Sequence, residues 1–470
     1  MWTYRNSGCA KSINVSIRFK RERLCERSEA ISWDCFAVRS ERRAPRNGNP
    51  LFTITVGFCL ILLFTPLAFA EDLKLQDLID EALKNNPEIL AHQARCEASE
   101  YRIPQARSLP DPMFMFGYQN EGFDQFTIGK EPNAQGMFSL SQMFFFPGKR
   151  SLKGEMAKRD AESSEAMANA TKLQVLAKVK ESYYDLFLAH KNIEILDERT
   201  SLFSRIEGAA LARYSAGMAP QQEVIMAQTE KYMLLEKEEM QRQKIQALEG
   251  MLNTTLGRDV NLALGKPAEP PYTTYPMDMD ELLKMVSEKS PEILSKEKMI
   301  EAADAKIRMA KKEYYPDFTI NAGYFPRTRG LLDMWSLTTT INLPLYYKTK
   351  QQQAVLEADA SRAQAQRELI STQYMLSSGI RENYSMLTTS EKLMTLYKDG
   401  LIPKTYQDFE LALAGYVTGK VEAVTAITRL KALLDFELLY WGQRMEREKA
   451  IARLEAITGI MNPPSGHNEQ

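Results

Sequence analysis

The residue types that carry covalent or metal chemistry are scarce in this chain of 470 residues. It contains 3 histidines (His92, His190 and His467) and 5 cysteines, of which only Cys96 lies beyond residue 70. No His/Cys/Glu cluster has metal-ligand spacing, and no phosphate-cradling glycine loop, nucleophile elbow or paired catalytic carboxylate is found. The pattern predicts a protein that is not an enzyme, with no cofactor and no metal site.

The methionines and His190 suggest two weaker chemical hypotheses, each with a structural alternative. The 23 methionines could bind soft metals, but Met113, Met115 and Met137 are scattered through predicted strands, so we prefer a structural role. His190 occupies a seam position of a long predicted helix, and a satisfied packing histidine is preferred to a ligand. Cys96 alone cannot form an internal disulfide framework.

The elements that position the remaining distinctive residues occur twice. The segment 212–217, Ala-Arg-Tyr-Ser-Ala-Gly, returns as Ala-Gly-Tyr-Val-Thr-Gly at 414–419, and 252–257 returns as 454–459. The spacing is 202 positions for three pairs: Tyr214 and Tyr416, Gly217 and Gly419, Gly257 and Gly459. A fixed period of this kind indicates an internal duplication.

Each copy contains a long predicted helical hairpin. Apolar residues recur at three- and four-residue spacing: Leu176, Val179, Tyr183 and Leu186 in the first copy, and Ile380, Tyr384, Leu387 and Met394 in the second. A helix from Pro147 to Tyr214 would be roughly 100 Å long. Its Lys, Glu and Gln content excludes burial in lipid, so we expect it to project into water as a coiled-coil partner. Tyr-x-x-Gly then reverses the chain, and a second helix returns to Leu256.

Shorter helices and strands precede each hairpin. Asn86-Pro87 and Ser290-Pro291 separate two predicted helices in each copy, and Pro110-Asp111 and Pro316-Asp317 end the second. The period then changes from 3.6 to 2, which predicts strands. The predicted strands cover 113–118, 138–144, 318–324 and 336–343.

The predicted strands have one apolar face and one face rich in Ser, Thr and Asn. A soluble antiparallel sheet is one reading, and a transmembrane barrel with a wet lumen fits the polar rows better. Four strands cannot close a barrel, because the smallest transmembrane barrels have about eight. If these hairpins enter a membrane, copies of the chain must pool their strands.

The leader differs from the rest of the chain in charge. Residues 1–70 hold eleven Lys/Arg and five Asp/Glu, so the remainder is mildly acidic, which argues against nucleic acid as a partner. Residues 51–70 read as a signal peptide ending in Ala68-Phe69-Ala70. A transmembrane anchor is the alternative, and Pro66 and the cleavage motif weigh against it. The predicted organisation is an N-terminal extension from an over-long start (1–50), the signal (51–70), a first repeat (71–264), a Pro-rich linker (265–277), a second repeat (278–460) and a tail (461–470).

Basic residues gather where the second strand of each predicted hairpin leads into a long helix. We interpret them as contacts to lipid phosphates at the membrane surface, with a solvated helix start as the alternative. They are Lys149, Arg150, Lys153, Lys348 and Lys350.

The signal peptide, the duplicated helix–hairpin–long-helix unit, the Pro-Asp before the strands and the Tyr-x-x-Gly tips together resemble the TolC-family outer-membrane efflux proteins, over about 73–459. The resemblance implies a mainly α fold with a transmembrane β part. It implies a homotrimer in which each chain adds four strands to one β-barrel in outer-membrane lipid and long helices to a periplasmic α-barrel. It also implies a passive efflux duct that docks a periplasmic adaptor and an inner-membrane pump.

The resemblance also suggests where the tunnel closes and where the adaptor docks. The family often closes on a ring of acidic residues, but Thr425 and Thr428 stand at the corresponding positions here, and the nearest acids are Glu422 and Glu223. Both acids could equally be solvated helix residues. The docking tips would be Tyr214, Gly217, Tyr416 and Gly419, which are also needed to turn the chain.

Two readings of function remain open at this stage. The preferred one is the outer-membrane duct, whose cargo the sequence does not reveal. The alternative is a secreted, soluble coiled-coil scaffold, which would explain the helices and the duplication but not the four Ser/Thr-alternating strands.

Overall fold

The computed structural model describes residues 73–327 and 330–460. The predicted extension, signal peptide and tail lie outside the described residues, as does His467. The predicted domain boundaries therefore stay predictions where they fall in these segments.

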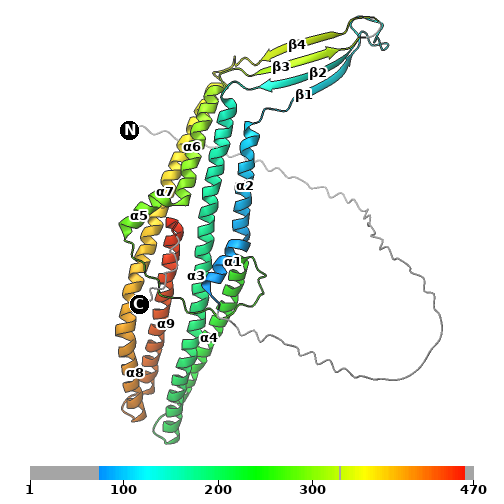
Figure 1. The fold of residues 1–470 in the computed structure, drawn as a ribbon. Helices are drawn as coiled ribbons and strands as arrows, with labels where there is room; N and C mark the ends of the chain where they lie inside the picture. Colours follow the sequence, from blue (N-terminus) through cyan, green and yellow to red (C-terminus); the bar gives the residue numbers. More distant parts are fainter. Residues whose placement is uncertain (1–72, 328–329, 461–470) are drawn as a thin grey trace, which may run out of the picture. The chain divides into compact units, whose positions relative to one another are not determined.

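The two halves of the described chain contain corresponding elements in the same order, except that the long helix of the second half is divided (Figure 1). The first half contains α1 (Leu75–Asn85), α2 (Pro87–Arg107), β1 (Met113–Gln119), β2 (Gln135–Phe144), α3 (Lys149–Ser215) and α4 (Gln221–Leu256). The second half contains α5 (Met279–Lys289), α6 (Pro291–Lys312), β3 (Phe318–Phe325), β4 (Met334–Ile341), α7 (Gln351–Thr395), the π-helical segment η1 (Leu396–Leu401), α8 (Ile402–Val417) and α9 (Ala423–Thr458).

The Asn-Pro and Ser-Pro junctions divide helices as predicted. Asn86 has extended backbone angles, and its side chain accepts hydrogen bonds from the amides of Glu88 and Ile89, both at 2.9 Å. Pro87 follows at the first helical position, where a missing N–H costs nothing. Ser290 and Pro291 repeat this backbone geometry between α5 and α6.

Helix α3 is the central element of the helical part. It runs uninterrupted for 67 residues, close to the predicted length, and packs against α2, α4, α6 and α9. Val179 and Leu186 are fully buried in the core that it shares with α1, α4 and α9. Among the described residues, no helix combines the length and the apolar character needed to cross a bilayer.

The corresponding helix of the second half is interrupted, which the sequence pattern did not reveal. Tyr183 and Tyr384 are 201 positions apart, whereas Tyr214 and Tyr416, nearer the tips, are 202 apart. The extra residue falls between them, and the helix accommodates it in η1. Such single-turn π segments are the usual way for a helix to absorb one inserted residue without changing its register on either side.

The four strands form one antiparallel sheet in the order β1-β2-β3-β4. The register places Phe116, Phe138, Tyr324 and Trp335 in one row across the sheet. The neighbouring row on the opposite face is Met115, Ser139, Gly323 and Ser336. The predicted apolar and polar faces are therefore confirmed, although β4 ends at Ile341, before the predicted end at residue 343.

The apolar face of the sheet is exposed in the single chain. Phe116 is 76% exposed, Trp335 79% and Leu337 65%. Large apolar side chains exposed together on one face mark a surface that contacts a partner or a membrane. The sheet lies at the ends of α2, α3, α6 and α7, away from the turns that end the two helical hairpins (Figure 1).

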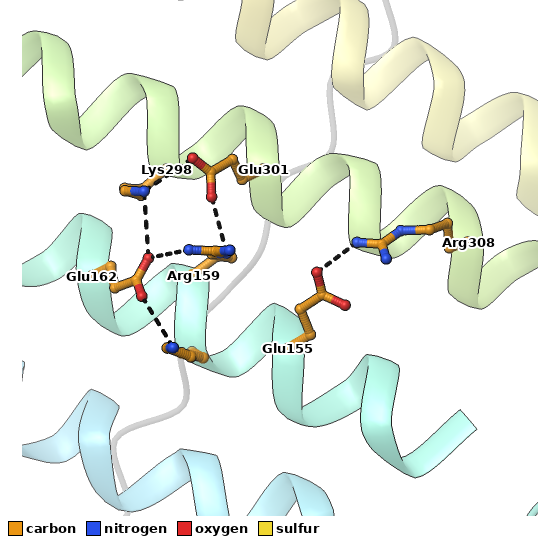
Figure 2. Close-up of polar contacts among 7 residues, drawn as sticks. Glu155, Arg159, Glu162, Lys298, Glu301 and Arg308 are labelled. Carbon is orange, nitrogen blue, oxygen red and sulfur yellow. Dashed lines mark hydrogen bonds and ion pairs between the residues drawn. The ribbon is translucent and has the colours of Figure 1, made fainter. Parts of the chain in front are cut away.

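Ion pairs fasten the first half to the second along α3 and α6 (Figure 2). Arg159 of α3 lies between Glu162 of its own helix, at 2.7 Å, and Glu301 of α6, at 2.9 Å. Glu155 and Arg308 form a further pair between these helices at 2.6 Å. Because these charges are paired, α3 packs against several neighbouring helices although it is rich in Lys and Glu and is not apolar on every face.

Candidate functional site

The tips of the two helical hairpins turn by the same backbone geometry. Gly217 and Gly419 have φ angles of 69° and 78°, in the left-handed region that favours glycine. The amide of Gly217 donates to the carbonyl of Tyr214 at 2.9 Å, and Gly419 donates to that of Tyr416 at 3.0 Å. The predicted reversal at Tyr-x-x-Gly is confirmed in both copies.

Three side chains join the two tips to each other. Tyr416, at the end of α8, is fully buried, and its hydroxyl donates to the carboxylate of Glu223 in the first turn of α4 at 2.8 Å. The guanidinium of Arg213, near the end of α3, lies 4.7 Å from the centre of the Tyr416 ring and donates to the Tyr416 carbonyl. We call Arg213, Glu223 and Tyr416 the tip cluster.

The electrostatics of the tip cluster favour a neutral phenol between two charges. Burial and the hydrogen bond to Glu223 raise the pKa of Tyr416 well above its ordinary value. The phenol therefore stays protonated and donates to Glu223, while the Arg213 cation lies over the ring face, an arrangement favoured by the ring quadrupole. The contact is specific, and it holds the two hairpins together at their ends.

The other residues predicted for the gate and the tips do not join this cluster. Tyr214 is 44% exposed. Glu422 is exposed at the N-terminus of α9, where its carbonyl accepts from the Thr425 amide at 3.1 Å. Thr428 bonds back to the Val424 carbonyl of its own helix at 2.7 Å. Of the four predicted gate residues, the structure brings Glu223 into contact with the opposite hairpin.

Arg213 is a tip residue to which the sequence assigned no role. Its counterpart 202 positions later is Gly415, so the duplicated motif differs in charge at this position. That difference between two otherwise similar copies was the available signal.

One of the predicted lipid contacts is wrong. Lys149 is 1% exposed, and its ammonium lies 3.2 Å from a carboxylate oxygen of Glu313 and 3.0 Å from Asp317. Two carboxylates already hold this cation inside the chain, so it is not available to a lipid phosphate.

The remaining basic residues stay a prediction as membrane-surface contacts. Arg150 is exposed and donates through Nε to the Arg107 carbonyl at 2.8 Å. The Lys153 ammonium lies 3.9 Å from the centre of the Phe145 ring. Lys348 and Lys350 are exposed, in the segment between β4 and α7.

The residues with possible metal or redox chemistry are dispersed. Within residues 73–327 and 330–460, no three His, Cys, Asp or Glu side chains are grouped as a metal site would require. Burial, together with the charges of Glu100, Glu165 and Glu97, raises the pKa of the Cys96 thiol. The expectation that His190 is satisfied is wrong, because its buried Nε2 has no hydrogen-bond partner among the described residues.

Comparisons with known proteins agree with this architecture. The family model described as outer membrane efflux protein matches residues 78–258 and 282–459, once in each half of the chain. The chain is 21% identical over 407 residues to the cobalt-zinc-cadmium resistance protein CzcC of Cupriavidus metallidurans, covering 84% of this chain and 92% of that protein. It is 24% identical over 306 residues to the toluene efflux pump outer membrane protein TtgC of Pseudomonas putida, covering 59% and 60%.

Solved structures share the fold. The outer membrane protein VceC of Vibrio cholerae superposes with a TM-score of 0.70 at 16% identity, over 82% of this chain and 96% of that one. A membrane protein from Pseudomonas aeruginosa gives 0.72 at 18% identity, over 82% and 90%. The fold is that of channels with a helical periplasmic part and a strand part in the outer membrane, and the alternative of a soluble scaffold finds no support. The chain belongs to the outer membrane efflux protein family.

Proposed function

We propose that this chain is the passive exit duct of a tripartite efflux system and works as a homotrimer. The observation that carries the proposal is the open four-stranded sheet with an exposed apolar face, attached to long helices that are polar enough to stand in water. Three copies would supply twelve strands, enough for a closed transmembrane barrel, whereas one copy cannot close. The helices would continue the barrel as a tunnel in the periplasm.

The duct would dock a periplasmic adaptor and an energised inner-membrane pump at the hairpin tips. Tyr214 offers an exposed aromatic ring there, and the turns at Gly217 and Gly419 present backbone groups. Tyr416 is buried under Arg213, so its role would be to hold the tips rather than to touch the adaptor. The names of two relatives mention metal-ion resistance and toluene efflux, and the cargo of this chain stays unassigned between such classes.

The tip cluster supports a gate at the periplasmic end of the tunnel. Glu223 would be tied to Tyr416 in the closed state, and Glu422, with Thr425 and Thr428 beside it, would face the narrow mouth. Three copies of an acidic residue around a mouth attract cations and repel one another. Opening would separate the two hairpins and break the hydrogen bond between Tyr416 and Glu223.

The proposal is tested by planar-bilayer conductance of the detergent-purified protein, with its mass measured in solution. We expect a trimer that inserts and conducts feebly, because the periplasmic end is closed. A monomer that never inserts would overturn the duct.

The gate has a separate test on the same channels. Glu422→Gln should reduce cation preference if the side chain faces the mouth, and Glu223→Gln should raise conductance by loosening the tips. If the double variant keeps both the cation preference and the conductance of the parent channel, the gate assignment is wrong although the duct stands.

A further inference from the structure

A buried ion pair joins the two repeats where the sheet meets the helices. Lys149, the first residue of α3, lies 3.0 Å from the carboxylate of Asp317, which stands directly before β3. The same ammonium donates to the Tyr315 carbonyl at 3.0 Å, and Asp317 also accepts from the Phe146 amide at 2.7 Å. We call Lys149 and Asp317 the junction pair.

The duplication places a second set of these charges in the chain. Pro110-Asp111 corresponds to Pro316-Asp317 at a spacing of 206, and the same spacing aligns Gly117-Tyr118 with Gly323-Tyr324. Asp111 is therefore the counterpart of Asp317.

The counterpart of Lys149 follows from the helices. Glu181, Tyr183 and Leu186 of α3 have Glu382, Tyr384 and Leu387 as counterparts in α7, at a spacing of 201. Both helices are unbroken from these residues back to their first turns, so the spacing is kept and Lys350 stands in the place of Lys149.

These two counterparts cannot meet within one chain. Asp111 precedes β1 and Lys350 follows β4, and β1 and β4 are the opposite edges of the sheet. Both side chains are exposed, and neither makes a hydrogen bond or ion pair with another residue in the described part of the chain. An acid and a base are thus left at two free sheet edges.

The junction pair differs from the other ion pairs between the repeats, because both of its charged residues have charged counterparts in the other repeat. Arg453, which pairs with Glu181 across the repeats at 2.7 Å, is replaced by Met251 at the corresponding position. Arg159, which pairs across α3 and α6, is replaced by Ala360. Among the ion pairs that the described residues form between the repeats, the junction pair is the one for which both charges return.

We propose that Lys350 of one copy binds Asp111 of a neighbouring copy, which repeats the junction pair at the seam between chains. The inference rests on the proposed duct, because it needs copies that pool their strands. Arg107 stands where the second repeat has Glu313, and its side chain lies against Gly154 of its own chain. The seam lysine would therefore be held by Asp111 with no second carboxylate.

The strand hairpins have their own correspondence, in which Ser139 and Thr338 are 199 positions apart, and it fixes the strand register at the seam. The two residues by which this differs from the helix spacing of 201 lie between β4 and α7. Within the chain, Ser139 of β2 is opposite Gly323 of β3. The two hairpin registers make Thr338 the counterpart of Ser139, and Gly117 is the counterpart of Gly323. Thr338 of β4 would then lie opposite Gly117 of a neighbouring copy.

A zero-length carbodiimide reaction on the purified full chain tests the pair, because it joins a carboxylate to an amine only where they touch. We expect an amide between Asp111 and Lys350, found by mass spectrometry in the band of linked chains. Lys350→Arg keeps the charge and should abolish this amide while the oligomer remains. The pair of Lys306 and Glu357, 3.1 Å apart within one chain, is the positive control.

The possible outcomes distinguish failure of the proposed pair between Lys350 and Asp111 from failure of the proposed duct. An oligomer by mass that yields the Lys306–Glu357 amide but no amide between Asp111 and Lys350 would overturn the pair and leave the duct standing. A monomer would overturn both.

The register has its own test in a background in which all five cysteines are replaced by Ser, because opposite residues on neighbouring strands are close enough for a disulfide. Thr338→Cys with Gly117→Cys should link chains on oxidation, whereas Thr340→Cys with Gly117→Cys, shifted by two residues, should not. The reverse result would overturn the register.

Discussion

The two helical hairpins descend from one sequence pattern but have become different structures. In the first, α3 is a single helix of 67 residues, whereas the second divides the same length among α7, η1 and α8. At the tips, Tyr214 is 44% exposed and its counterpart Tyr416 is fully buried. The first hairpin is an unbroken support, and the second carries an interruption and is fastened to the first at its end.

The hairpins also differ in the side chains that stand at corresponding positions near their middle. His190 of α3 corresponds to Glu391 of α7, and Ile245 of α4 corresponds to Arg447 of α9. Arg447 donates to Glu391 at 2.9 Å and to the buried Glu448 at 2.6 Å. The comparison teaches that duplication preserved lengths and turns, while charge and helix continuity diverged between the copies.

The largest effect should come from deleting one residue in each hairpin. Removing Gly208 from α3 would rotate everything beyond it by about 100°, taking Ala210 out of the core and Arg213 off Tyr416. Removing Gly400 from η1 should convert the π turn into α-helix and leave both flanks in register. Oligomer yield by light scattering should collapse for the first deletion and persist for the second. Equal losses would show that η1 is not an absorbed insertion.

The next effect concerns the buried charges of the second hairpin. Arg447→Ala leaves the Glu448 carboxylate buried without its partner, which should lower the free energy of unfolding by about 3–5 kcal/mol. Thermal unfolding followed by circular dichroism would measure the loss. Arg429→Ala is the control, because Arg429 and Asp408 form an exposed pair that should contribute less than about 1 kcal/mol. A loss as small as that of the control would mean that the pair at Arg447 is dispensable.

Replacing the tip tyrosine by Phe should speed amide exchange in the second hairpin but not in the first. Tyr416→Phe removes a hydrogen bond to a carboxylate, at a cost of about 2 kcal/mol, which corresponds to roughly 30-fold faster amide exchange in α8. Tyr214→Phe should leave exchange at the end of α3 unchanged, because the ring is partly in solvent. Hydrogen exchange with mass spectrometry would compare the two, and similar rates would contradict the asymmetry of the tips.

The smallest effect should be a pH dependence at His190. Burial, and then the charge of Lys266, lower the pKa of this imidazole, so the folded state favours the neutral form. Its stabilising contribution is complete above the unfolded pKa of about 6.5 and is lost as the pH falls below that value. His190→Gln should flatten the change of melting temperature between about pH 6.5 and pH 5. If the variant keeps the parent's change of melting temperature with pH, a group other than His190 causes that change.

Much of the fold was predictable because its signals are periodic. The apolar spacing of α3, the Pro-Asp before the strands and the Tyr-x-x-Gly turns each depend on local backbone preference, and all are found. The π turn was missed because one inserted residue does not disturb the apolar spacing on either side of it. The comparison of spacings between the copies, 201 against 202, was the signal available.

The candidate site was harder to predict because its contacts are long-range. Lys149 is buried by carboxylates more than 160 positions away, and nothing near it in sequence distinguishes it from the exposed Arg150. Glu223 was named for its charge, but its partner Tyr416 lies 193 positions away and was assigned to adaptor docking and to a turn.

The two free edges of the sheet have a consequence for the order of assembly. A single chain has one exposed edge at β1 and one at β4, and any open row of chains joined edge to edge still has two. Each added chain pairs with one free strand edge and exposes a new one. The number of unpaired edges therefore falls only when a ring closes. Partial assemblies should therefore be short-lived, and biogenesis should pass from separate chains to the finished ring with few intermediates in between.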